Sequence, residues 1–279
     1  MILDKKDNVI QRHLDSLQKP DICDIKIRGC DGEVAANKLL LRLSCPFFSS
    51  MFSPQSNFVE HEAGSITLPH TKTVLEKVVK YLYSGQMDCE QMNVTSLLEL
   101  MGLFNYMNLS EEFSTVELFA LERIKSGQFP LLDCLNALDI SSQFGLEMAG
   151  QALVFHLGQN IAEISQMEAV GSLSQDWLIR LVEEKKEVRG QTFARFQTLV
   201  RWLSVNVMEA DKKEEVIRNI DLDHFTFKEL VSDVRQSGLF PVDKIFERME
   251  QLFDAQKKEM EEEMEEKVEA WKSLAASGE

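Results

Sequence analysis

Residues 23–52 read CDIKIRGCDGEVAANKLLLRLSCPFFSSMF and decide the fold of the first part of the chain. Segment 24–28 alternates polar and apolar residues, and segment 33–36 is a second short run that follows a turn containing Gly32. Two such runs around a glycine-bearing turn predict a β-hairpin. Segment 38–52 then has apolar residues at helical spacing. It predicts one helix, with an apolar side formed by Leu39, Leu40, Leu43, Phe47 and Met51.

The flanking segments extend this mixed pattern. Residues 4–18 predict a short amphipathic helix whose apolar face consists of Ile10, Leu14 and Leu17. Residues 65–68 predict a third strand, stopped by Pro69. Further helical patterns follow at 73–83, 95–106 and 113–126. We therefore expect an α+β first third, and a helical chain after about residue 90.

Composition limits the classes of partner and compartment. The 279 residues include 46 acidic and 30 basic side chains, which leaves a formal charge of −16. An acidic surface repels phosphate backbones, so we expect no nucleic-acid partner. The five cysteines are scattered, which favours free thiols in a reducing compartment. Without a signal-like start or a long apolar run, we expect no membrane partner and a cytoplasmic or nuclear location.

A search for catalytic and metal-binding motifs finds none that is specific. The chain has no GxGxxG or GxxxxGK[ST] phosphate loop, no GxSxG elbow and no HExxH zinc helix. Cys45, His61 and His70 could converge on a metal, and a cysteine–histidine pair could act as a nucleophile, but both patterns are weak. We expect no cofactor, no metal and no enzymatic activity. An enzyme with a site assembled from scattered residues is the least favoured alternative.

Separated blocks within residues 6–125 occur in an order that resembles a BTB (POZ) domain. They are CDIKI at 23–27, VAANKLLL at 34–41, SCPFFSSMF at 44–52, ITL at 66–68, the helix that ends in VKYLYSG at 79–85, and LLELM at 97–101. The chain departs from the family at Asn37, where a histidine is usual, which puts a local packing contact in question.

This resemblance implies a homodimer. Ile10, Leu14 and Leu17 would pack on the other protomer, and Asp24 and Lys38 match a charged pair near the dimer centre. The alternative is that Asp24 caps a turn and Lys38 is solvated. A partly buried pair would make the removal of either member costly, because the other charge would stay unpaired.

The same resemblance implies a cullin-3 contact. Phe58-Val59-Glu60 is similar to the hydrophobic-x-glutamate motif by which BTB adaptors bind the N-terminal region of cullin-3. Phe58 would enter a cleft on the cullin, Glu60 would orient the loop, and Tyr106 would lie on the same face. The alternative is that Phe58 packs on its own domain and Glu60 is merely exposed.

The helical half resembles a BACK domain over residues 130–250, with a break between domains expected at 127–130. The motifs are DCLNALDISSQFGL at 133–146, LSQDWLIRL at 173–181 and TLVRWL at 198–203. Leu173, Leu178, Trp202 and Leu230 are expected in its core. Residues 251–279 form an acidic helix, which we expect to pack on its own domain rather than in a coiled coil. Its apolar stripe begins before it and comprises Phe246, Met249, Phe253, Met260, Met264, Val268 and Trp271.

Two functional hypotheses follow from these resemblances. The first is a dimeric BTB–BACK adaptor, similar to the kelch-like type but without kelch repeats, that links an unknown substrate protein to a cullin-3 ubiquitin ligase. The second is a BTB–BACK scaffold for transcriptional or cytoskeletal assembly that recruits no cullin.

Overall fold

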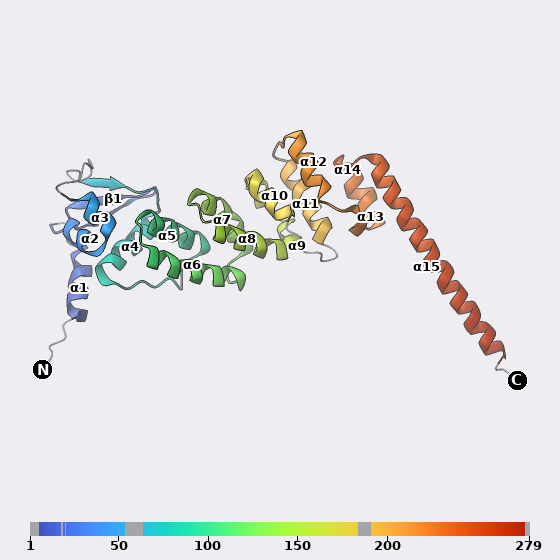
Figure 1. Ribbon diagram of the computed structural model, residues 1–279, viewed down its shortest axis with the longest axis horizontal. Coiled ribbons are helices and arrows are strands. Elements are labelled where there is room, and N and C mark those ends of the chain that lie inside the picture. The colour runs from blue at the N-terminus through green and yellow to red at the C-terminus, as the bar shows by residue number, and fades with distance from the viewer. Residues whose placement is uncertain (1–5, 18, 20, 54–63, 184–190, 277–279) are drawn as a thin grey trace. The chain divides into compact units, whose positions relative to one another are not determined.

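The computed structural model describes residues 6–17, 19, 21–53, 64–183 and 191–276 (Figure 1). The chain divides into two compact units, Met1–Leu157 and Gly158–Glu279. Each unit has its own buried core, and each is described by itself below.

A small three-stranded sheet anchors the first unit. Its strands are β1 (Ile25–Arg28), β2 (Glu33–Ala36) and β3 (Ser65–Thr67), in the order β2-β1-β3. β1 pairs antiparallel with β2 and parallel with β3. Alternate residues on these strands point into the core, because side chains on a strand alternate between its two faces; the buried ones include Ile25, Ile27 and Ile66. The predicted hairpin and the third strand are confirmed.

The predicted single helix over 38–52 is wrong, because Pro46 divides it. The structure has α2 (Lys38–Ser44) and α3 (Pro46–Met51), with extended backbone at Cys45 (φ −143°, ψ 123°). A residue that precedes proline is pushed out of the helical region by the proline ring. The predicted apolar side is right for Met51, which is buried, and wrong for Leu39 and Leu43, which are exposed. The core also receives Leu41, Phe48 and Phe52, which the prediction had left out.

Helices complete the first unit around the sheet. They are α1 (Lys6–Ser16), α4 (Lys72–Ser84), α5 (Val94–Tyr106), α6 (Ser110–Lys125), α7 (Leu131–Gln143) and α8 (Glu147–Gln159), which runs across the boundary between the units. α5 contacts α4, α6 and α7, and α1 lies against α4. Gly102 of α5 lets α7 approach closely, since a Cβ there would lie 2.5 Å from Cγ of Phe144.

The break expected at 127–130 lies inside the first compact unit. Phe144, which follows α7, stacks on the ring of His70 with centroids 4.9 Å apart. This contact and the α5–α7 packing join α7 to the first unit, and the division between the units falls after Leu157. The sequence break at Gly127 is a turn with a positive φ of 69°. The BACK assignment of residues 130–250 stays a prediction.

The second unit is entirely helical over its described residues. Its elements are α9 (Ile161–Ile164), η2 (Glu168–Ser172), α10 (Gln175–Glu183), α11 (Gln191–Leu203), α12 (Ala210–Arg218), η3 (Leu222–His224), α13 (Phe227–Glu229), η4 (Leu230–Val234), α14 (Arg235–Ser237) and α15 (Val242–Ala276). α11 is the central element and contacts α9, η2 and α10. The residues expected in the core, Leu173, Leu178, Trp202 and Leu230, are all buried.

α15 is one unbroken helix of 35 residues (Figure 1). Its first turns pack on η3 and η4, with Ile245 buried. From Phe253 on, every residue whose side chain is described is exposed. The predicted helix is therefore confirmed. The expectation that residues 251–279 pack on their own domain is wrong for the described side chains from Phe253 on, because packing is limited to the first turns of α15. Within the described ranges, no helix combines the length and the apolar character that crossing a membrane requires.

Candidate functional site

The apolar face of α1 is half-covered by the first unit itself. Ile10, Leu14 and Leu17 are each partly exposed. Leu14 and Leu17 line a hollow of about 390 Å³ together with Val34 of β2 and residues of α4, including Glu76. These side chains therefore keep apolar surface that a second surface could bury.

Asp24 and Lys38 lie together at the start of α2. The carboxylate of Asp24 accepts a hydrogen bond from the backbone N–H of Lys38 at 2.7 Å. A carboxylate at a helix N-terminus also interacts favourably with the helix dipole. The ammonium of Lys38 lies 5.5 Å from the ring centroid of Phe52, at cation–π distance. Asp24 thus supports the helix start, and its pairing at a dimer centre stays a prediction.

Leu39 and Leu43, predicted on the apolar side of a helix, form an exposed apolar face on α2. Their side chains are 60% and 76% exposed. They lie four residues apart and so occupy one face of the helix. The sequence feature that could have warned of this difference is Pro46, because a proline interrupts the single helix over 38–52 from which the apolar side was predicted. We call Leu39 and Leu43 the α2 face.

Of the cullin-contact residues, Tyr106 alone lies within the described ranges. Phe58 and Glu60 fall in segment 54–63, outside them. Tyr106 ends α5, is 58% exposed, and has its ring centroid 5.3 Å from that of Phe47 on α3. α3 is the helix that immediately precedes segment 54–63. Tyr106 is therefore presented to solvent beside the helix that leads into Phe58-Val59-Glu60.

Burial disfavours the charged form of several thiols and imidazoles in the first unit. Burial raises the pKa of Cys45, and it raises the pKa of Cys134 to about 12. A thiol with a raised pKa is a poor nucleophile because little thiolate is present. Burial lowers the pKa of His70, against a smaller opposing effect of Glu99. Among described residues, no three His, Cys, Asp or Glu side chains are grouped to hold a metal ion; His61 lies outside these residues.

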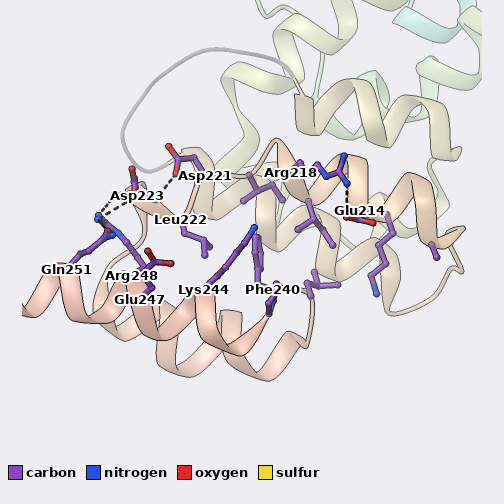
Figure 2. A pocket seen from close by; sticks show the side chains of 16 residues that line it. Glu214, Arg218, Asp221, Leu222, Asp223, Phe240, Lys244, Glu247, Arg248 and Gln251 are labelled. Atoms are coloured by element: carbon purple, nitrogen blue, oxygen red, sulfur yellow. Dashed lines mark hydrogen bonds and ion pairs between the residues drawn. The ribbon is translucent and has the colours of Figure 1, made fainter.

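The second unit has a large groove of about 890 Å³ (Figure 2). α12 and η3 form one side and α15 the other, and Lys244, Glu247 and Arg248 rise from α15 toward them. Its apolar lining consists of Ala210, Ile217, Ile220, Leu222, Leu239, Phe240 and Pro241. Sequence reasoning did not find this groove, because its residues come from segments separated by turns.

The charges of the groove are balanced, and four of the eight charged side chains pair with one another. Four basic and four acidic side chains line it: Lys213, Arg218, Lys244, Arg248, Glu214, Asp221, Asp223 and Glu247. Arg218 pairs with Glu214 at 2.7 Å. Arg248 lies 3.4 Å from the carboxylate of Asp223 and donates to its carbonyl oxygen at 2.6 Å. The lining contains no serine, threonine, cysteine, histidine or tyrosine among the described residues. The groove thus combines an apolar floor with charged side chains of both signs.

Comparisons with known proteins match the first unit most specifically. Residues 14–116 match the BTB/POZ domain. The chain is 26% identical over 200 residues to Kelch-like protein 30 of Mus musculus, covering 69% of this chain and 32% of that protein. It is 24% identical over 196 residues to Kelch-like protein 28 of Homo sapiens, covering 70% and 33%. The match thus spans about a third of the length of these relatives.

Two solved structures that resemble the chain are BTB domains. The BTB domain of zebrafish PATZ1 is 12% identical, with a TM-score of 0.34, and covers 43% of this chain and 95% of that one. The BTB domain of human Gigaxonin is 15% identical, with a TM-score of 0.31 and the same coverage of the two chains.

Proposed function

Since residues 14–116 are a BTB/POZ domain and the relatives are Kelch-like proteins, we propose that this chain is a dimeric adaptor. It links a client protein to a cullin-3 ubiquitin ligase. The chain supplies binding surfaces, and the chemistry of ubiquitin transfer belongs to other subunits. Its contribution to the rate is proximity, because a client held beside the ligase reacts at a raised effective concentration.

Dimerisation is supported by apolar surface on two helices of the BTB domain. The α2 face is mostly exposed, and Ile10 and Leu14 of α1, together with Leu17 just after it, are partly exposed. A two-fold interface uses the same patch on both copies, so each apolar side chain that it buries counts twice. Fully burying one leucine stabilises by roughly 1.5–3 kcal/mol. The charges of Asp24 and Lys38 would then fix the register of the two copies.

The observation that carries the cullin proposal is the position of Tyr106. Its exposed ring lies against Phe47 of α3, and the chain continues from α3 into the segment that contains Phe58-Val59-Glu60. We place the cullin contact there: Phe58 is the apolar anchor, Glu60 orients the loop, and Tyr106 forms the edge of the surface. An anchor of this kind dominates the affinity of an interface when a cleft on the partner encloses it.

The direct test is calorimetric titration of the full chain with an N-terminal fragment of cullin-3. We expect the wild-type chain to bind. The double variant Phe58→Ala with Glu60→Ala should weaken binding by at least about tenfold, and Tyr106→Ala by less. Leu118→Ala is the matched control, since Leu118 is an apolar residue of the same unit that is 69% exposed on α6.

Two results would count against the proposal in different ways. Equal affinity of the wild-type chain and the double variant would show that the motif is misassigned. Failure of the wild-type chain to bind would contradict the adaptor function and favour the scaffold that recruits no cullin.

A further inference from the structure

The exposed part of α15 carries apolar side chains along a single face. They are Phe253, Met260, Met264, Val268 and Trp271, with exposed fractions of 63%, 68%, 66%, 49% and 78%. At 3.6 residues per turn, all five fall within an arc of about 80° around the helix axis. We call these five residues the α15 stripe. No side chain described in this unit covers the stripe, and it is more apolar surface than a solvated helix needs.

The stripe follows an 11-residue period. Met249, Met260 and Trp271 are spaced by eleven residues, and so are Phe253 and Met264. Eleven residues in three turns give 3.67 residues per turn, close to that of a straight α-helix. The stripe therefore stays on one side of the helix over its whole length. A partner helix can lie along it without the left-handed supercoil that a heptad repeat imposes.

The charge around the stripe selects the partner. Residues 259–269 contain seven glutamates, Glu259, Glu261, Glu262, Glu263, Glu265, Glu266 and Glu269, against one basic residue, Lys267. That lysine pairs within the helix, 3.2 Å from Glu263. Lys257 and Lys258 pair in the same way, at 3.9 Å from Glu261 and 3.7 Å from Glu262.

The charge around the stripe disfavours the two other obvious occupants. A second copy of α15 laid in parallel would bring its own seven glutamates alongside these, and like charges at such distances repel. Anionic membranes attract helices with lysine or arginine on the polar face, which is the opposite of the polar face of α15. A basic segment meets both requirements of the surface, because its apolar side chains cover the stripe and its cations face the glutamates.

We propose that α15 binds a basic amphipathic helix of a client protein through the α15 stripe. Methionine is well suited to such a surface, because its flexible and polarisable side chain adapts to different apolar partners. The inference deepens the proposed adaptor function by naming the class of client, and in that sense rests on it. Binding at α15 itself needs neither the cullin nor the BTB domain.

The test uses the full chain and two synthetic helical peptides. Both carry leucines on one face; the polar positions are lysine in the first peptide and glutamate in the second. Trp271 reports binding by fluorescence, because it is 78% exposed while Trp177 and Trp202 are only 4% and 3% exposed. We expect the lysine peptide to shift the emission to shorter wavelength, in a saturable way that weakens with added salt. The glutamate peptide should produce no shift.

Variants separate specific docking from general attraction to an acidic protein. Met260→Gln with Met264→Gln keeps the charge and uses a good helix former, so the helix should persist. This double variant should bind the lysine peptide at least about tenfold more weakly than the wild type does. Val207→Gln is the matched control, since Val207 is 94% exposed outside α15 in the same unit, and it should change nothing. Glu261→Gln with Glu263→Gln should weaken binding mainly at low salt.

Three results would overturn the inference: equal binding of the two peptides, no binding of the lysine peptide, or the same affinity for the double methionine variant and the wild type. A fourth would reassign the stripe to a second copy of this chain, namely a fall in the solution mass of the free protein in that variant. The experiment contains no cullin. Its failure would therefore leave the cullin titration untouched, and the reverse also holds.

Discussion

At the start of α2, Asn37 contacts three separate parts of the first unit. Its side-chain oxygen accepts from the backbone N–H of Leu40, its amide nitrogen donates to the carbonyl of Ile22 at 2.8 Å, and its backbone N–H donates to the hydroxyl of Tyr83 at 2.7 Å. The departure from the histidine usual in BTB domains is thus accommodated by an N-cap, a position that asparagine favours.

Replacement of Asn37 tests this cap. Asn37→Ala should lower the free energy of unfolding by about 1–2 kcal/mol, because it removes both side-chain hydrogen bonds. Asn37→Asp keeps the capping acceptor and loses the donor to Ile22, so it should cost less. Urea denaturation followed by circular dichroism measures both variants. If Asn37→Ala had the same urea midpoint as the wild type, the cap would contribute nothing to the stability of the fold.

The buried imidazole of His70 makes the first unit sensitive to acid. Burial lowers its pKa below the usual 6.5, so at pH values between the two the unfolded chain binds a proton that the folded chain does not. The free energy of unfolding therefore falls as the pH drops through 6.5 and continues to fall down to the folded pKa. The neighbouring Glu99 acts in the opposite direction but is the weaker influence.

Thermal melts between neutral and mildly acidic pH test the role of His70. The melting temperature of the wild type should fall as the pH is lowered. The melting temperature of His70→Phe should fall less, and this variant retains a ring against Phe144. A residual slope is expected from His156, whose pKa is also lowered by burial. Identical slopes for His70→Phe and the wild type would contradict this account.

Sequence reasoning identified residues of interest but did not predict their contacts. Asp24 and Lys38 were expected to form a charged pair near a dimer centre; in the structure the carboxylate of Asp24 accepts from the backbone N–H of Lys38, and the charged pair stays a prediction. Leu39 and Leu43 were placed on the apolar side of a single helix over 38–52, yet they are exposed, and Pro46 divides that helix in two. Phe58 and Glu60 lie outside the described residues, so their roles stay predictions.

At the scale of elements, the sheet was predictable and the association of the helices was not. Period-two alternation in 24–28 identifies β1, and Ile25 and Ile27 are buried as that pattern requires. The packing of α7 on the first unit depends on Gly102 making room for Phe144. The two residues are 42 positions apart (144 minus 102), so no local pattern signals the contact. The groove between α12 and α15 escaped prediction for the same reason.

The α2 face supplies a prediction about dimerisation. Leu43→Glu should weaken self-association by at least about tenfold, because it would place a charge in an interface that excludes water. The monomer should remain folded, since Leu43 is 76% exposed. Leu118→Glu on α6 is the matched control. Sedimentation equilibrium gives the dissociation constants, and an unchanged constant for Leu43→Glu would remove α2 from the interface.

At the scale of the whole molecule, the proposed adaptor function assigns different surfaces to the two units. The first provides the surfaces proposed for self-association and cullin binding, and the second provides the groove and the α15 stripe. A formal charge of −16 opposes non-specific contact with nucleic acids and favours basic clients. A dimer would present two client surfaces to the ligase, which raises the effective concentration of any client with two binding segments.

The most direct test of the adaptor account is the mass of the protein in solution, measured by light scattering after size exclusion, with and without an N-terminal fragment of cullin-3. The account predicts twice the chain mass of 31.9 kDa for the free protein. With the fragment it predicts a complex of two chains and two fragments, which Phe58→Ala with Glu60→Ala reduces to the free dimer. A mass of one chain at micromolar concentration, with no co-elution of the fragment, would contradict both halves of the proposal.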